Sequence, residues 1–231
     1  MSLAVYSLQL LLLVSQGVVI FFLAFGQVRR YLFLFLYCFV DLVTGISEQV
    51  VGRIFGERSP LFVNIYWTNE VLVDLLLFLL VIDLIRRVAD RPSSRTVAGR
   101  ILLAVLLTAF VLPFLYGHRL FAELGGKTVL AGRWFNVASQ VLNFGGVATN
   151  LVLWGALLGS KRRDTLLLLV STGLGLACTA LAINYGIRVL TRNVELRSVG
   201  TILALLARIA GTMIWCWAFR PVGQSRESLS Q

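Results

Sequence analysis

Four acidic side chains stand inside two neighbouring apolar segments of this chain. Asp41 and Glu48 are seven residues apart, and Glu70 and Asp74 are four apart, so each pair shares one face of a helix. Carboxylates are rare in hydrocarbon because they are costly there, and they usually have a partner or a function. Arg208 lies in the middle of a later apolar segment. These residue types at this spacing predict a site for a proton, a cation or a basic ligand.

Amide side chains form a second polar stripe on a different apolar segment. They recur at helical spacing: Asn136, Gln140, Asn143 and Asn150. Amides in membrane helices commonly hydrogen-bond a neighbouring helix, but they can also line a cavity. Both interpretations stay open, and Asn143 is the member that we place with the acidic residues.

Two arrangements of the charged residues are compatible with the sequence. In the first, Arg208 pairs with one carboxylate and the other acids are protonated or hydrogen-bonded within a packed core. In the second, the excess of acids over bases lines a cavity for a small cationic or polar ligand. The second is our working hypothesis. It makes these residues candidates for ligand or proton binding: Asp41, Glu48, Glu70, Asp74, Asn143 and Arg208.

The composition defines the elements that must position these side chains. Of 231 residues, 58% are hydrophobic and only 14% are charged, and the mean hydropathy is +0.86. Soluble domains carry about 25% charged residues, so the chain is expected to be a polytopic membrane protein with the lipid bilayer as its partner. The formal net charge of +10 comes from basic residues between the apolar segments, which argues against nucleic-acid binding.

Seven apolar segments predict an all-α fold, a seven-transmembrane-helix bundle in one domain of residues 1–220. The expected helices are 3–25, 31–54, 61–85, 101–116, 134–158, 166–190 and 199–219, followed by a polar tail, 221–231. Three isolated cysteines and the single His118 form no metal-binding pattern, so neither a metal nor a cofactor is expected.

The distribution of basic residues predicts an orientation for this bundle. Twelve Lys and Arg lie on the side that holds the C-terminal tail and eight on the other. The positive-inside rule then places the N-terminus outside and the C-terminus in the cytoplasm of a multi-pass cell-membrane protein, expected in a bacterial inner membrane. The basic loops Arg86–Arg100 and Lys161–Arg163 are expected to face anionic lipid or a cytoplasmic protein partner. The sequence does not define an oligomeric state.

No catalytic motif is present, so we expect that the protein is not an enzyme. A membrane zinc hydrolase needs several histidines, and an aspartyl intramembrane protease needs a Gly-x-Gly-Asp sequence. Three other classes stay open: a receptor or sensor, a proton- or cation-coupled transporter or channel, and a structural or accessory subunit.

Short motifs near the ends of two segments carry a family resemblance. They are Tyr66-Trp67-x-x-Glu70, Arg86-Arg87, Ile214-Trp215-x-Trp217 and Arg220-Pro221. On these motifs the chain resembles uncharacterised stand-alone bacterial seven-helix membrane proteins and is similar to the seven-transmembrane sensor modules of bacterial histidine kinases. The resemblance implies a sensor-like membrane protein, and it implies neither a ligand nor a reaction.

Overall fold

The described part of the chain is helical, in agreement with the all-α prediction. The computed structural model describes residues 3–25, 28–56, 59–88, 100, 103–104, 107–108, 111, 127–159, 164–191 and 194–220. Within these ranges lie six long helices: α1 (Leu3–Ala24), α2 (Leu32–Phe55), α3 (Pro60–Val88), α5 (Lys127–Gly159), α6 (Thr165–Leu190) and α7 (Val194–Phe219).

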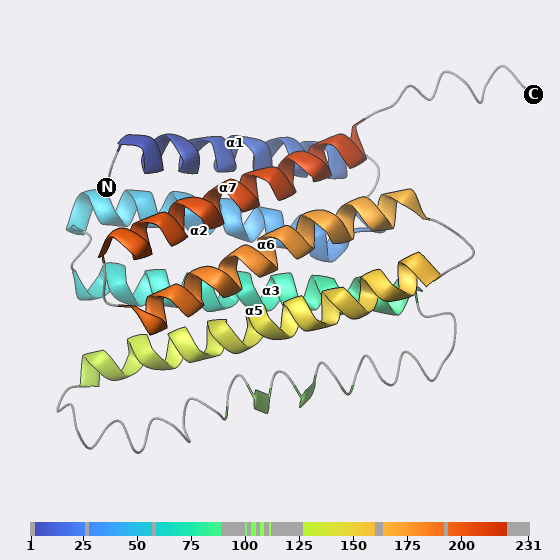
Figure 1. The fold of residues 1–231 in the computed structure, drawn as a ribbon. Coiled ribbons are helices and arrows are strands. Elements are labelled where there is room, and N and C mark those ends of the chain that lie inside the picture. Colours follow the sequence, from blue (N-terminus) through green and yellow to red (C-terminus); the bar gives the residue numbers. More distant parts are fainter. Residues whose placement is uncertain are drawn as a thin grey trace, which may run out of the picture.

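The six helices lie side by side as a bundle, and their contacts close a ring (Figure 1). Around this ring α1 packs on α2, α2 on α3, α3 on α5, α5 on α6, α6 on α7, and α7 on α1. A further contact between α3 and α6 crosses the ring and divides it into two parts. One part is enclosed by α1, α2, α3, α6 and α7, and the other is the tight group of α3, α5 and α6.

Local sequence signals explain where α2 ends and where α3 and α6 begin. Gly56 has a φ of 81° and its N–H donates to the Gly52 carbonyl oxygen at 3.0 Å, which closes α2 in a conformation that favours glycine. Ser59 accepts a hydrogen bond from the Phe62 N–H at 3.2 Å, immediately before Pro60 at the first position of α3. Asp164 caps α6 in the same way, accepting from the Leu167 N–H at 3.1 Å.

Small residues bring α6 and α7 into close contact, as the many small residues in segment 166–190 predict. A Cβ atom on Gly173 would lie 2.8 Å from the Gly211 carbonyl oxygen, and one on Gly211 would lie 2.7 Å from the Gly173 carbonyl oxygen. The backbones therefore approach at a distance that only glycine permits. Trp215 fills the space beside this crossing, and its Nε1–H donates to the Val170 carbonyl oxygen at 3.0 Å.

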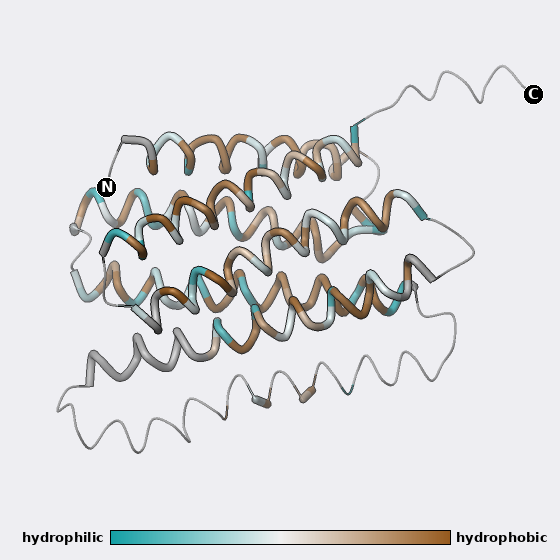
Figure 2. The backbone as a smooth tube through the Cα atoms, viewed as in Figure 1, coloured by the Kyte–Doolittle hydropathy of each residue, from teal (hydrophilic) through white to brown (hydrophobic). Residues whose placement is uncertain are grey.

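Among the described residues, four helices are long and apolar enough to cross a membrane, which indicates a membrane protein. They are Val5–Ala24 of α1, Leu32–Phe55 of α2, Thr165–Ile187 of α6 and Glu195–Phe219 of α7. Apolar residues dominate these helices, whereas polar residues gather at helix ends and at a few interior positions (Figure 2). Large apolar side chains are exposed on the outer faces, for example Phe39, Leu151, Ile183 and Leu203. Such a surface suits contact with lipid.

The prediction of a seven-transmembrane-helix bundle is wrong. The described residues form six long helices, and four of them qualify as membrane spans. The prediction counted every apolar run as an equivalent span, but α3 and α5 carry more charged and amide side chains than runs such as α1. The inferred orientation, N-terminus outside and C-terminus cytoplasmic, depended on an odd number of spans and loses its basis with that count.

Several predicted segments lie wholly or mostly outside the described residues. They are the tail 221–231, residues 89–99 of the basic loop Arg86–Arg100, the loop Lys161–Arg163, and most of the expected helix 101–116. The other expected helices agree with the structure apart from their ends. The largest differences are at α5, which begins at Lys127 rather than at 134, and at α7, which begins at Val194 rather than at 199.

Candidate functional site

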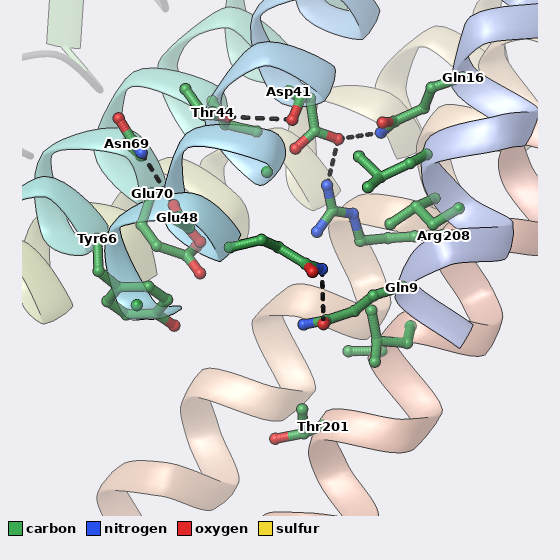
Figure 3. Close-up of a pocket in the computed structure, with 18 of the residues that line it drawn as sticks. Gln9, Gln16, Asp41, Thr44, Glu48, Tyr66, Asn69, Glu70, Thr201 and Arg208 are labelled. Carbon is green, nitrogen blue, oxygen red and sulfur yellow. Dashed lines mark hydrogen bonds and ion pairs between the residues drawn. The ribbon is translucent and has the colours of Figure 1, made fainter. Parts of the chain in front are cut away.

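A cavity of about 630 Å³ lies within the larger part of the helix ring. Its lining comes from α1, α2, α3, α6 and α7, and none of the described side chains of α5 belongs to it. The cavity extends from the end of the bundle that holds the start of α1 and the end of α2 to the middle of the helices. Figure 3 displays the polar side chains that point into it.

An ion pair forms the floor of the cavity. Asp41 Oδ2 accepts hydrogen bonds from Arg208 Nη2 of α7 and from Gln16 Nε2 of α1, so three helices meet at one carboxylate (Figure 3). The side chains of Arg208 and Asp41 are only 18% and 10% exposed. In such surroundings each charge needs the other, because an unpaired buried charge is strongly unfavourable. The pair leaves no net formal charge at the floor.

Two further carboxylates line the wall of the cavity, and neither forms an ion pair with a described Lys or Arg. Glu48 on α2 accepts a hydrogen bond from Asn69 Nδ2 at 3.0 Å. Glu70 on α3 accepts one from the hydroxyl of Tyr185 at 2.8 Å. The two acids lie on the same side of the cavity, across from Arg208 (Figure 3). In the described part of the chain, each of these carboxyl groups therefore accepts a hydrogen bond from a neutral donor and has no ion-pair partner.

Aromatic rings stand beside these acids toward the open end. Tyr6, Phe62 and Tyr66 all line the cavity. Arg53 is exposed at this end, where its guanidinium donates to the Tyr6 hydroxyl at 2.7 Å and lies 5.6 Å from the centre of the Tyr6 ring. Arg53 also lines the cavity, but it forms no ion pair with Glu48 or Glu70.

The opposite end of the cavity is closed by packed aromatic side chains. Tyr37 and Trp215 meet edge to face with their ring centres 5.9 Å apart, and Tyr31 meets Phe219 in the same manner at 5.1 Å. All four side chains are buried in one apolar cluster together with Cys38 and Leu34. The cavity is consequently open at one end only.

The structure brings together four of the six predicted site residues. Asp41, Glu48, Glu70 and Arg208 line the cavity, whereas Asp74 and Asn143 do not. Those two side chains are 1% exposed each and lie between α3 and α5. Residue spacing shows which face of α3 carries Asp74. It does not show which helix packs against that face, and in the structure this helix is α5.

One member of the amide stripe on α5, Asn150, joins two helices, and neither Asn143 nor Asn150 lines the cavity. Asn150 accepts a hydrogen bond from the Ser171 hydroxyl at 3.0 Å and donates to the Ser171 carbonyl oxygen at 3.3 Å, which links α5 to α6. Asn143 donates to the Ser139 carbonyl oxygen of its own helix at 2.9 Å. Of the two interpretations left open by the sequence, the contacts of Asn150 agree with helix-to-helix hydrogen bonding.

Sequence reasoning missed three residues that complete the site: Gln16, Asn69 and Tyr185. Gln16 lies seven residues after Gln9, so both share one face of α1, and this shared polar face was the available signal. Asn69 directly precedes Glu70 in the sequence, and this neighbouring polar position was the available signal. Its hydrogen-bond partner, Glu48, lies on α2. No sequence signal distinguishes Tyr185 from other tyrosines, because its role depends on α6 lying beside α3.

Comparison with known proteins found no matching family model, and no curated protein or solved structure gave a significant match. Among the described residues, no three His, Cys, Asp or Glu side chains gather in a way that could hold a metal ion. The chemistry of the site therefore rests on its own geometry: two carboxylates with no cationic partner in the described part, aromatic rings, and a neutralised floor.

Proposed function

We propose that this chain is a multi-pass protein of the cell membrane that binds a small organic cation in the cavity, in the manner of a receptor or sensor. The observation that carries the proposal is the pairing pattern of the acids. Asp41 is neutralised by Arg208, while Glu48 and Glu70 line the same cavity with no ion-pair partner among the described residues. A bound cation would supply the missing charge.

The aromatic lining favours an organic ammonium group over a bare metal ion. A cation over the face of a tyrosine or phenylalanine ring gains about 0.5–2 kcal/mol, depending on how far it is desolvated. Tyr66 lies next to the two acids in the lining (Figure 3), and Phe62 stacks on Tyr66 with the ring centres 6.2 Å apart. A volume of about 630 Å³ is in the range of small-molecule sites, which measure about 300–1,000 Å³.

The closed end of the cavity supports binding rather than an open channel. The ion pair at the floor and the edge-to-face pair of Tyr37 and Trp215 lie between the cavity and the other end of the bundle. A ligand entering from the open end therefore reaches the floor and goes no further in this conformation. Flux of the bound cation through liposomes that contain the pure protein would contradict this part of the proposal.

Binding is tested by calorimetric titration of the protein in lipid nanodiscs with choline and tetramethylammonium. Glu48→Gln and Glu70→Gln are each expected to weaken binding at least tenfold, which corresponds to about 1.4 kcal/mol. Asp83→Asn is the matched control, because Asp83 is an acid of α3 that is already paired with Arg87 at 2.7 Å. The proposal fails if neither cation binds or if the three variants bind equally well.

A folding defect in one variant does not obscure the result. Glu70 accepts a hydrogen bond from Tyr185, and Glu48 accepts one from Asn69, so the two acids are supported by different neighbours. If Glu70→Gln does not fold, the Glu70 carboxylate is structural and Glu48→Gln becomes the decisive variant. Unchanged choline affinity in a folded Glu48→Gln protein would then overturn the proposal.

A further inference from the structure

A second polar cluster lies outside the cavity, buried between α3 and α5. It consists of Asp74, Ser139 and Asn143, which are 1%, 0% and 1% exposed. The side chains of Ser139 and Asn143 both stand beside the Asp74 carboxyl group. The neighbouring apolar cluster of α3 and α5 includes Phe78 and Leu142. A carboxyl group at this place is therefore surrounded by protein and has no access to bulk water.

The hydrogen bonds of this cluster are incomplete. Asp74 Oδ2, Ser139 Oγ and Asn143 Oδ1 are buried and have no hydrogen-bond partner among the described residues. Asn143 uses its amide group for the Ser139 carbonyl oxygen. The Ser139 hydroxyl and the second amide hydrogen of Asn143 are the donors beside the Asp74 carboxyl group, and both donors are neutral. Buried polar atoms in proteins are nearly always paired, so three unpaired oxygen atoms in one buried cluster favour a neutral acid over a carboxylate, which can only accept hydrogen bonds.

The surrounding charges do not supply a cation for Asp74. The titratable neighbours that act on it are Glu70 of the same helix, Tyr185 and Cys178 of α6, and Arg208 of α7. Arg208 is paired with Asp41, and no described Lys or Arg forms an ion pair with Asp74. On α2, the acids Asp41 and Glu48 line the cavity. The acids nearest to Asp74 therefore repel a negative charge there.

We propose that Asp74 is a proton-binding site, and that its carboxyl group holds a proton at neutral pH. The carboxylate takes up one proton from water and becomes a neutral carboxylic acid, and no other bond changes. The added hydrogen turns one acceptor oxygen of the cluster into a donor, which can pair with Ser139 Oγ or Asn143 Oδ1. The site goes beyond the proposed cation binding and does not depend on it.

The cavity supplies the route by which this proton exchanges with water. Glu70 precedes Asp74 by one helical turn on α3 and lines the cavity. The Tyr185 hydroxyl, which donates to Glu70, belongs to a side chain that is 2% exposed and lies close enough to Asp74 to be influenced by its charge. Glu70 and Tyr185 thus stand between the open cavity and the buried cluster.

Infrared spectroscopy of the full chain in nanodiscs tests the proposal without any added ligand. The protein is produced with carbon-13-labelled aspartate, so that the carbonyl stretch of a protonated aspartic acid is separated from that of glutamic acid. Wild type is expected to show this band at neutral pH, with a downward shift in heavy water. Asp74→Asn is expected to lose the band, and the control Asp83→Asn is expected to retain it, because Asp83 pairs with Arg87.

Asn143→Leu keeps the test informative if Asp74→Asn does not fold. This variant removes an acceptor of the acid hydrogen, so the band should move to higher wavenumber rather than disappear. The proposal is overturned if wild type has no aspartic acid band, or if the band survives in Asp74→Asn. It is also overturned if the band appears only when sodium is replaced by Tris, because the three oxygen atoms then hold a hard cation. A failure of choline binding affects none of these results.

Discussion

Arg208 on α7 and Asp41 on α2 form an ion pair between two helices that are not adjacent in the ring of helix contacts. The long arginine side chain spans the interval, and Gln16 of α1 donates to the same carboxylate oxygen. The pair therefore does two things. It ties three helices together at mid-bundle. It also leaves Glu48 and Glu70 as acids of the cavity that have no ion-pair partner in the described part of the chain.

Removing one partner of this pair should destabilise the protein strongly. Arg208→Gln leaves the buried Asp41 carboxylate without a cation, and breaking a buried pair in this way typically costs about 3–5 kcal/mol. We expect a large drop in the midpoint of thermal unfolding, which can be measured by tryptophan fluorescence of the protein in detergent. The double variant Asp41→Asn with Arg208→Gln should recover much of the loss, because it leaves no unpaired charge. Equal destabilisation in the single and double variants would contradict this assignment.

The reaction rate of a cysteine placed at the open end of the cavity should reveal the negative charge of the cavity. Thr201 lines the cavity at the start of α7. Thr201→Cys is expected to react several times faster with a cationic methanethiosulfonate than with an anionic one of similar size, since Glu48 and Glu70 attract the cation. Leu203→Cys is the control, because Leu203 is 55% exposed on the apolar outer face and should react slowly with both reagents. Equal rates at Thr201→Cys would argue against an acidic cavity.

The aromatic ring at position 66 should contribute to ligand affinity. Tyr66→Leu is expected to weaken choline binding about threefold to thirtyfold, which is the range of cation–π energies at partly desolvated sites. Tyr66→Phe keeps the ring and should retain most of the affinity. The measurement is the same calorimetric titration, and a Tyr66→Phe protein as weak as Tyr66→Leu would show that the hydroxyl, not the ring, is what matters.

The crossing of α6 and α7 should tolerate no side chain at its centre. In Gly173→Ala the new Cβ would lie 2.5 Å from Trp215 Nε1 and 2.8 Å from the Gly211 carbonyl oxygen. Overpacking of this kind costs about 1–3 kcal/mol, so the unfolding midpoint should fall. Gly186→Ala on the same helix is the matched control. Nothing lies within 4 Å of its Cβ position, and alanine favours a helix, so its midpoint should stay or rise.

Much of the secondary structure could be predicted, whereas the number of membrane spans could not. Apolar runs of about 20 residues predict helices, and α1, α2, α3 and α6 begin and end close to the expected positions. The starts of α5 and α7 were placed too late, because polar residues such as Lys127 and Glu195 were assigned to loops although the helices continue through them. Apolar length alone also does not decide which helices cross a membrane, which is why the count of seven is wrong.

For the site, the sequence by itself determined which residues carry charge inside apolar segments: Asp41, Glu48, Glu70, Asp74 and Arg208. Periodicity also placed each acid on a helix face. Only the tertiary structure decided which faces meet. It pairs Arg208 with Asp41, opens Glu48 and Glu70 to a cavity, and encloses Asp74 with Ser139 and Asn143 between α3 and α5. The physical reason is that residue spacing defines direction within one helix, while the partner of a side chain depends on the packing of different helices.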